Sequence, residues 1–267
     1  MDLIVREKVE SGVLLLRLND PSTRNAISEL AMIEALLGAI AEAEGNPAVR
    51  VIILTGEGSS FSSGGNIKKL GRGAGYQDNV PAQTRLNYKS GIQRLPLAFE
   101  KLEVPVIAAI NGPAIGAGLD LALMCDIRIA SEAAKFAESF VKLGIIPGDG
   151  GAWLLPRIVG FAKASELALT GDTIDAAEGL AIGLVSRVVP PAALLPEAQK
   201  IAGRIASNPR HAVRMTKQLL RQAHRLSLNQ TLELSSAFQA LAHETRDHEE
   251  AVAAVREKRK PNFQVDL

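Results

Sequence analysis

Apolar and polar residues follow two different periods in the first part of the chain. Residues 9–17 alternate between apolar and polar positions and end at a turn at residues 19–21, so they predict a pair of strands. Residues 28–44 carry apolar side chains at helical spacing. This second segment predicts a helix with Ser28 as its N-cap and residues 45–47 as its end.

Strand, turn and helix then recur through the middle of the chain. The apolar runs at residues 49–55, 104–110 and 126–130 predict buried strands, and residues 116–124 predict a short helix between the last two. This order is typical of a layered α/β fold with crossover helices. From residue 192 to residue 259 nearly the whole sequence is helix-forming, which predicts a helical C-terminal appendage.

Composition limits the class of protein. The chain has 267 residues, of which 47% are hydrophobic and 22% charged, as expected for one large folded domain or a core with an appendage. The formal net charge of +1 gives no overall field that would favour nucleic acid or an anionic membrane. A single cysteine, Cys125, excludes an intrachain disulfide and a multi-cysteine zinc site.

Two segments without a regular apolar pattern lead to further expectations. Residues 1–8 include four charged side chains and lack the apolar core of a signal peptide, so the sequence predicts a soluble, cytoplasmic protein. The polar residues 71–87 follow neither period and predict a mobile loop.

Two glycine-rich loops are candidates for chemistry. Residues 61–66 are expected to run into a helix that begins near Asn66, and residues 116–118 open the helix that contains Asp120. Free N–H groups at helix N-termini favour an anion, or a carbonyl oxygen that is becoming one. Two such loops that face each other would form an oxyanion hole. The alternative is that the glycines only form turns and allow close packing.

Two aspartates are candidate acids or bases. Asp120 lies three residues beyond Ala117 and is followed by an apolar run, which predicts a buried carboxylate placed for proton transfer. The alternative for Asp120 is an ordinary aspartate on a helix surface. Asp149 lies in a Gly-Asp-Gly segment, so it is either a turn residue or a second acid/base group.

Other motifs are absent or point elsewhere. The sequence has neither the phosphate-binding G-x-x-x-x-G-K-[ST] motif nor the G-x-S-x-G nucleophile motif. The spacing of His243 and His248 does not match a zinc site, and no metal is predicted.

A stripe of basic residues at helical spacing has a different set of possible roles. We expect a solvated helix face, and binding of phosphate, RNA or a neighbouring subunit is the alternative. This basic stripe consists of Arg210, Arg214, Lys217, Arg221 and Arg225.

Four longer segments resemble a known family. They are FSSGGNIKK (residues 61–69), VPVIAAINGPAIGAGLDLALMCDIRIAS (residues 104–131), LGIIPGDGGAWLLPRIVG (residues 143–160) and NPRHAVRMTKQLL (residues 208–220). Together with DPSTRNAIS at residues 20–28, they closely resemble the crotonase superfamily, the enoyl-CoA hydratases and isomerases. The resemblance covers essentially the whole chain, in the family's order.

The resemblance implies a fold and an assembly. It implies a spiral of ββα units over residues 1–195 that binds acyl-CoA and carries out catalysis. It implies a helical trimerisation region over residues 196–267 and a homotrimer or homohexamer. No cofactor is expected, since coenzyme A is part of the substrate, and neither a membrane nor nucleic acid is expected as a partner.

The resemblance also assigns the site. It places the thioester oxygen on the backbone N–H groups of Gly65 and Ala117, where the family usually has Ala and Gly. The loop at residues 71–87 is expected to shape the acyl pocket. The segments that match those lining coenzyme A supply Ala26, Ser62, Gly64, Asn66, Ile67 and Lys68.

The family's two catalytic glutamates are both replaced. The first position falls on Asp120 and the second on Phe140, which can line the substrate pocket but cannot transfer a proton. Glu138, two residues earlier, is expected to point elsewhere. These replacements favour a single-acid or an Asp120/Asp149 mechanism over hydration by two glutamates.

The sequence therefore predicts an acyl-CoA enzyme of the enoyl-CoA hydratase/isomerase type that stabilises a thioester enolate. One alternative is an isomerase, lyase or hydrolase of acyl-CoA without hydratase activity. Another is a non-catalytic binding protein with the crotonase fold.

Overall fold

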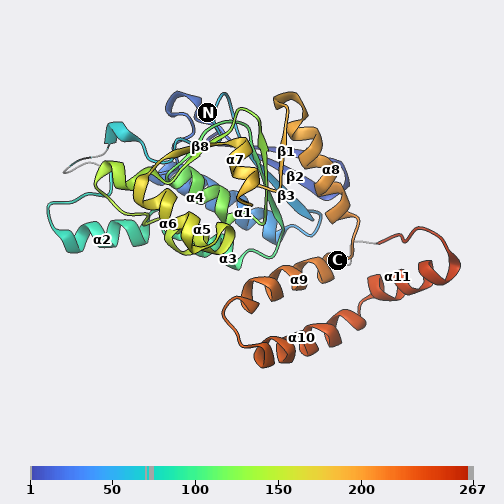
Figure 1. The fold of residues 1–267 in the computed structure, drawn as a ribbon. Coiled ribbons are helices and arrows are strands. Elements are labelled where there is room, and N and C mark those ends of the chain that lie inside the picture. Colours follow the sequence, from blue (N-terminus) through green and yellow to red (C-terminus); the bar gives the residue numbers. More distant parts are fainter. Residues whose placement is uncertain (1, 70, 72–74, 264–267) are drawn as a thin grey trace.

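The computed structural model describes residues 2–69, 71 and 75–263. Strands and helices alternate through the core, and helices alone make up the C-terminal part (Figure 1). In chain order the elements are β1 (Ile4–Val9), β2 (Val13–Leu18), α1 (Leu30–Gly45), β3 (Val51–Gly56), α2 (Pro81–Ser90), α3 (Arg94–Lys101), β4 (Val106–Ile110), β5 (Ala114–Ile115), α4 (Ala117–Met124), β6 (Ile127–Ser131), β7 (Lys135–Ala137), α5 (Gly151–Val159), α6 (Phe161–Thr170), β8 (Thr173–Asp175), α7 (Ala176–Ala181), β9 (Arg187–Val189), α8 (Leu194–Ala206), α9 (Arg210–Ala223), α10 (Leu228–His243) and α11 (Arg246–Glu257).

The strands form two sheets. The larger sheet has the order β1-β2-β3-β4-β6-β9, with β1 antiparallel to β2 and every other pair parallel. The smaller sheet has the order β5-β7-β8. Parallel neighbours require crossover connections, and the helices supply them. The predicted α/β class is therefore confirmed, and so is the predicted strand pair at the start of the chain.

Both faces of the larger sheet are buried. Successive side chains of a strand point to opposite faces, so β3 contributes to two apolar clusters. Ile52 and Leu54 pack with residues of α1, α3 and α4, while Val51 and Ile53 pack with residues of α8. A sheet covered on both faces has continuous apolar strands, which is why the strands of the core are visible in the sequence.

Three local expectations are wrong. Ser28 does not cap α1, which begins at Leu30; its Oγ instead accepts the N–H of Asn66 at 3.0 Å. The loop at residues 61–66 leads into a short 3₁₀ turn, η3 (Ile67–Lys69), and not into an α-helix. Part of the predicted mobile loop forms α2, and residues 72–74 of it lie outside the described residues. Because α2 has no buried residue, no apolar period marks it in the sequence.

The C-terminal helices divide into one that covers the sheet and three that extend from it. The buried residues of α8 belong to the sheet's second cluster, and α9 to α11 extend away from the sheets (Figure 1). The expected boundary between residues 195 and 196 falls inside α8, and the division into two domains stays a prediction. No helix in the described part of the chain combines the length and the apolar character needed to span a bilayer.

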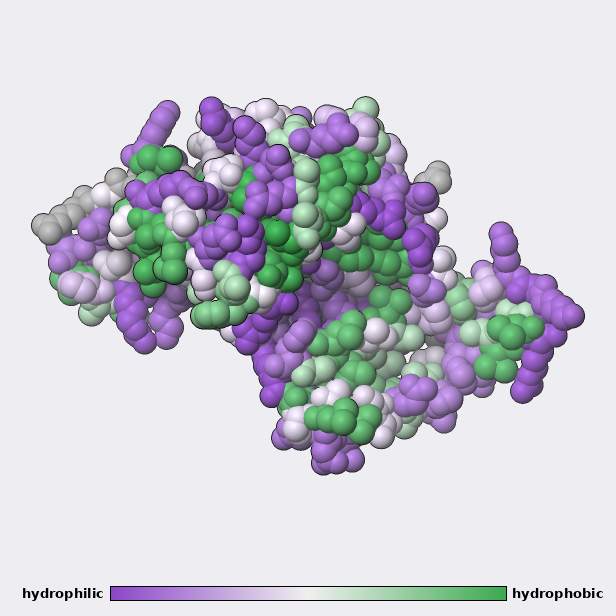
Figure 2. Space-filling view, viewed as in Figure 1, coloured by the Kyte–Doolittle hydropathy of each residue, from purple (hydrophilic) through white to green (hydrophobic). Residues whose placement is uncertain are grey.

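Apolar side chains remain exposed on the extended helices. α10 has no buried residue, and Leu228, Leu232 and Leu241 are each more than half exposed. Figure 2 shows apolar surface on this part of the molecule and a hollow between it and the core.

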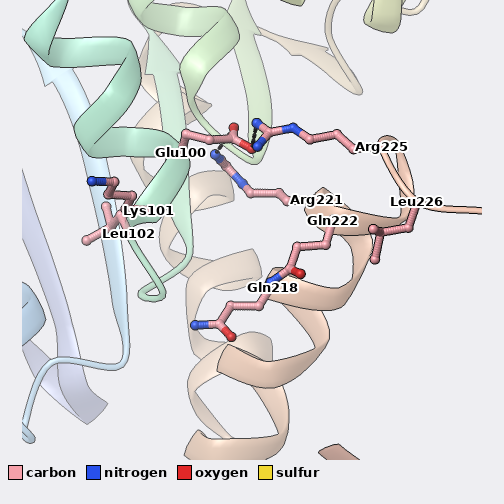
Figure 3. Close-up of a pocket in the computed structure, with 8 residues that line it drawn as sticks. All are labelled: Glu100, Lys101, Leu102, Gln218, Arg221, Gln222, Arg225 and Leu226. Atoms are coloured by element: carbon pink, nitrogen blue, oxygen red, sulfur yellow. Dashed lines mark hydrogen bonds and ion pairs between the residues drawn. The ribbon is translucent and has the colours of Figure 1, made fainter. Parts of the chain in front are cut away.

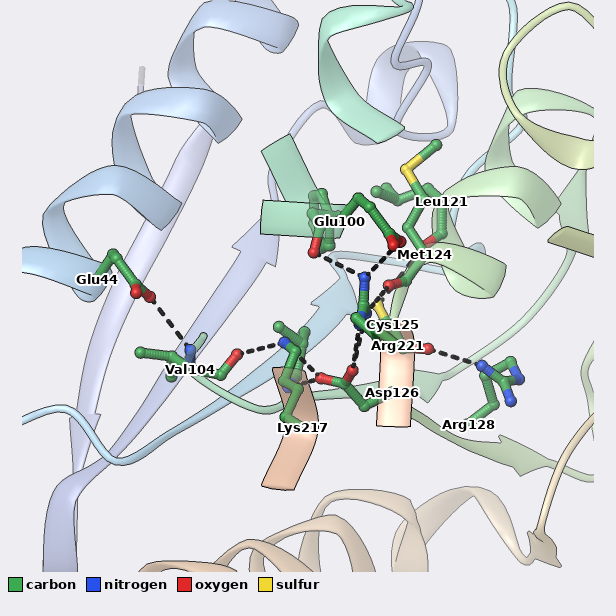
Figure 4. A network of polar contacts seen from close by, with 12 residues as sticks. Glu44, Glu100, Val104, Leu121, Met124, Cys125, Asp126, Arg128, Lys217 and Arg221 are labelled. Carbon is green, nitrogen blue, oxygen red and sulfur yellow. Dashed lines mark hydrogen bonds and ion pairs between the residues drawn. The ribbon is translucent and has the colours of Figure 1, made fainter. Parts of the chain in front are cut away.

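The basic stripe of α9 faces the core, so the expected solvated face is wrong. Lys217 is buried; its Nζ lies 2.8 Å from Oδ2 of Asp126 and donates to the carbonyl oxygen of Val104 at 2.7 Å (Figure 4). Arg221 donates to Oδ1 of Asp126 at 2.8 Å and to Glu100 at 3.0 Å. Spacing along a helix shows which side chains share a face, but not what lies opposite them.

Two more residues of the stripe make ion pairs with the core. Arg214 pairs with Glu44 at 3.3 Å, and Arg225 donates to Glu100 at 2.6 Å. A cavity of about 340 Å³ separates α3 from this part of α9 (Figure 3). The stripe therefore fixes α9 on the core by charge, and these four cations are not free to bind phosphate or RNA.

Candidate functional site

The two glycine-rich loops lie against each other. Ser62 and Ala114 form an isolated parallel bridge, and the N–H of Ile115 donates to the carbonyl oxygen of Ser62 at 3.1 Å. A Cβ atom at Gly64 would lie 2.2 Å from the carbonyl oxygen of Ile115 and 2.9 Å from the nitrogen of Ala117. Only glycine allows the first loop to approach the start of α4 this closely.

Residues 25–28 support the first loop from the side of the core. Ser62 Oγ donates to the carbonyl oxygen of Asn25 at 2.7 Å and accepts the N–H of Gly64 at 3.1 Å. The N–H of Ile27 donates to the carbonyl oxygen of Gly64 at 2.8 Å. Ala26 lies within this segment and is buried, so the residues that the sequence assigns to coenzyme A here also hold the loop in place.

Two backbone N–H groups are available where the loops meet. Ala117 is the first residue of α4, so its N–H has no acceptor within the helix. In the described part of the chain, the N–H of Gly65 donates to no other residue, and the space beside this glycine is open. The positive end of the α4 dipole adds to the attraction for a negative oxygen. Both predicted oxyanion residues thus lie on adjoining loops, and their role stays a prediction.

The remaining candidates for coenzyme A lie on η3 and just before it. The side chain of Ile67 is 70% exposed and Lys68 is exposed as well. Asn66 Oδ1 accepts the N–H of Lys68 at 3.2 Å and so shapes the turn. These residues are accessible to a ligand from the open side of the loop.

Three buried acidic side chains converge beside α4. Asp120 lies on α4, Glu138 follows β7, and Asp149 lies in the turn before α5; they are 0%, 1% and 6% exposed. A Cβ atom at Gly151 would lie 2.2 Å from both Oδ1 of Asp120 and Oε1 of Glu138. Neither carboxyl oxygen of Asp120 or Glu138 has a hydrogen-bond partner in the described structure, and neither does Oδ1 of Asp149.

The expectation that Glu138 points away from the site is wrong. β7 ends at Ala137, and Glu138 leads into the 3₁₀ turn η4 (Ser139–Leu143). The strand period of two therefore stops at Ala137 and does not set the directions of Glu138 and Phe140, which are both buried. An acidic residue inside a run of otherwise buried positions was the available signal in the sequence.

Burial dominates the titration of the three acids. Burial, and then the nearby Glu138 and Asp149, raise the pKa of Asp120 well above its usual value. Burial also raises the pKa of Glu138, and it raises the pKa of Asp149 to about 6. Burial of this kind moves the pKa of a carboxyl toward the neutral range, in which general acids and bases work.

Aromatic side chains form the apolar boundary of this region. A Cβ atom at Gly116 would lie 3.6 Å from the ring of Phe140, and Gly116 has a φ of +52°, which favours glycine. Phe140 therefore faces the start of α4. The rings of Tyr76 and Tyr88 stack with their centroids 4.8 Å apart, and Asp149 raises the pKa of Tyr88 after burial, which is the larger cause. Neither tyrosine stands out in the sequence as a site residue.

The acids do not form a metal site. Over the described ranges, no group of three or more His, Cys, Asp or Glu side chains has an arrangement that could hold a metal ion. His243 and His248 contact each other at 3.0 Å on the extended helices, far along the chain from the acids.

Comparison with known proteins identifies the family. The profile of the enoyl-CoA hydratase/isomerase family matches residues 8–266. A crotonyl-CoA hydratase from Syntrophomonas wolfei is 38% identical over 261 residues, which are 97% of each chain. A 1,2-epoxyphenylacetyl-CoA isomerase from Escherichia coli is 36% identical over 256 residues, which are 96% of each chain.

Solved structures agree. The 1.8 Å crystal structure of an enoyl-CoA hydratase from Bacillus anthracis superposes with a TM-score of 0.91 at 34% identity, covering 99% of this chain and 100% of that one. An enoyl-CoA hydratase from Mycobacterium smegmatis has a TM-score of 0.90 at 31% identity, covering 98% of both chains. The crotonase fold expected from the sequence is therefore confirmed. The chain belongs to the enoyl-CoA hydratase/isomerase family and is an enzyme of that type.

Proposed function

We propose that this enzyme adds water to 2-enoyl-CoA thioesters. The observation that carries the proposal is the position of the buried Asp120, which lies on the helix whose first N–H group is free and has two further buried acids beside it. A site that can both hold a developing oxyanion and move protons beside it is suited to chemistry at the α and β carbons of an acyl thioester.

The proposed roles follow from the chemistry of each group. The N–H groups of Gly65 and Ala117 donate hydrogen bonds to the thioester oxygen and stabilise it as it gains charge. Asp120 transfers protons beside this oxygen, and Asp149 modulates the charge of the acid cluster. Ala26, Ser62, Gly64, Asn66, Ile67 and Lys68 bind coenzyme A, and no further cofactor takes part.

The proposed assembly uses the exposed apolar residues of the C-terminal helices. A helix such as α10, which buries no residue within its own chain, gains stability when its apolar side chains are covered by another copy. A homotrimer, or a hexamer made of two trimers, is the proposed form.

Double-bond isomerisation is the second candidate function. The apolar ring of Phe140 beside Gly116 favours it, since proton transfer along a bound acyl chain needs no ordered water. In that case Asp120 alone would move a proton between two carbons of the acyl chain.

A substrate panel separates the two. Crotonyl-CoA is added to the purified enzyme, and the absorbance of the conjugated thioester is followed while products are identified by mass. Hydration predicts loss of absorbance and a 3-hydroxyacyl-CoA product. Activity only on 3-enoyl- or 2,4-dienoyl-CoA would support isomerisation, and no turnover of any acyl-CoA would contradict both.

A further inference from the structure

We infer that Glu138 is the second acid/base of this site and works with Asp120 as a pair, in place of the acid that the resemblance would put at position 140. This inference rests on the proposed function. It restores two-acid chemistry to a chain in which Phe140 occupies the position of the family's second acid.

The geometry of the pair is the first argument. Asp120 comes from α4 and Glu138 from the end of β7, yet both carboxyls approach a single point, the position of a Cβ atom at Gly151. A side chain at residue 151 would collide with both carboxyls. Because residue 151 is glycine, the two carboxyls share the small space that a side chain would fill.

Burial without partners is the second argument. Glu138 is 1% exposed, and neither of its oxygens accepts a hydrogen bond in the described structure. Within the same residues, no Lys, Arg or His makes an ion pair with Asp120 or Glu138. Burying a carboxyl without a partner is costly, and functional sites are where proteins accept such a cost.

Mutual repulsion makes the pair chemically asymmetric. Two carboxyls that share a buried site cannot both ionise easily, so one keeps its proton while the other is free to accept one. An acid and a base then stand side by side. Asp149 adds a third charge nearby and strengthens the preference for keeping a proton in the pair.

The proposed step balances without any further reactant. The oxygen of a water molecule bonds to the β carbon while one of its protons passes to the ionised carboxylate. The electron pair of the double bond moves toward the thioester, whose oxygen is held by the N–H groups of Gly65 and Ala117. The protonated carboxyl then gives its proton to the α carbon, so the pair holds the same number of protons before and after.

Glu138→Gln tests the inference directly. The variant keeps the shape of the side chain and removes the acid, so kcat for the substrate that the panel identifies should fall about 10²–10⁴-fold. KM should change by less than about threefold, since Glu138 is proposed to act on protons rather than to bind coenzyme A. Glu132→Gln, at an exposed position before β7, is the matched control and should behave as wild type.

The pH profile and a conservative variant separate catalysis from structure. The wild-type kcat should depend on two ionisations, and Glu138→Gln should lose one limb of the profile. Glu138→Asp should recover part of the lost activity. A loss in Glu138→Gln with an unchanged pH profile and no recovery in Glu138→Asp would show a structural role and overturn the inference, as would full activity in a folded Glu138→Gln.

Infrared spectroscopy tests the pair without turnover. At neutral pH the wild type should show the C=O stretch of a buried protonated carboxyl, and both Asp120→Asn and Glu138→Gln should remove or shift it. A band unchanged by Glu138→Gln would overturn the pairing. If only the proposed function is wrong, the result differs from this one: both variants still change the band, but the enzyme turns over no acyl-CoA.

Discussion

The backbone of Gly118 lies against Ser62, so closely that a Cβ atom at Gly118 would lie 2.3 Å from the carbonyl oxygen of Ser62. This contact joins the two loops whose N–H groups are proposed to hold the thioester. The proposed oxyanion site therefore depends on the spacing of two backbones, which a single methyl group would change.

Gly118→Ala is expected to separate the loops. The added methyl group would meet backbone, which cannot move aside as a flexible side chain does, and overpacking of this kind costs about 1–3 kcal/mol. Turnover should fall at least tenfold because the two N–H groups no longer converge. Thermal unfolding and steady-state kinetics measure both effects.

Gly65→Ala is the matched variant for that test. Nothing lies within 4 Å of a Cβ atom at Gly65, so the structure has room for the methyl group. The variant should keep its stability and most of its activity. Equal damage from both substitutions would show that the loops tolerate no side chain at all and would remove the argument from spacing.

Ala117→Pro is expected to remove one oxyanion donor and to leave the fold intact. Proline is favoured at the first position of a helix, where its missing N–H breaks no helical hydrogen bond. Loss of one such donor costs about 3–4 kcal/mol in the transition state, so turnover should fall about 10²-fold or more. Isothermal titration with coenzyme A should show nearly unchanged binding. Unchanged turnover would place the thioester elsewhere.

Asp149→Asn is expected to stabilise the protein above pH 6. The pKa of Asp149 rises from an unfolded value of 3.8 to about 6 in the folded state because of burial. The folded protein thus binds this proton more tightly, and the wild type loses stability relative to the variant as pH rises from 4 to 6. The difference should reach about 2–3 kcal/mol above pH 6.

Thermal unfolding between pH 4 and pH 8 at one protein concentration measures this effect. Asp172→Asn, which removes one charge from an exposed position, is the control. A stability difference that does not change with pH between Asp149→Asn and wild type would contradict the assignment.

Lys217→Met is expected to destabilise the protein by about 1–3 kcal/mol, because it removes one of the two cations that lie 2.8 Å from the carboxylate of Asp126 and leaves the carbonyl oxygen of Val104 without its donor. Arg225→Ala breaks a pair whose arginine side chain is 53% exposed, so it should cost less than about 1 kcal/mol. Urea unfolding of the two variants measures the contrast. Equal effects would show that α9 is not held by its buried charges.

The sequence predicts the core of this fold because burial leaves a strong pattern. β3 and β4 are buried along their whole length, and their apolar runs are visible without any structure. The same reasoning locates the glycine-rich loops, since close backbone contact requires glycine at Gly64 and Gly118.

The sequence does not show which residues from distant segments of the chain meet in the fold. Serine is a common N-cap residue, but the hydroxyl of Ser28 accepts a hydrogen bond from the N–H of Asn66 and does not cap α1. Arg221 reaches Asp126 across 95 positions of the chain, so its helix shows no acidic neighbour. Glu138 was misplaced for a related reason, because a strand that ends one residue earlier gives no period from which its direction follows.

The charges around Asp126 also determine where the chain can be shortened. A cut before Arg210 would remove Lys217 and Arg221 together, and Asp126 and Glu100 would lose the cations with which they pair. A cut after α9 would keep every one of these pairs and remove only α10 and α11, and α10 buries nothing within its own chain. The shortest version that keeps all of these ion pairs, with the pair between Arg225 and Glu100 among them, therefore ends just past Arg225.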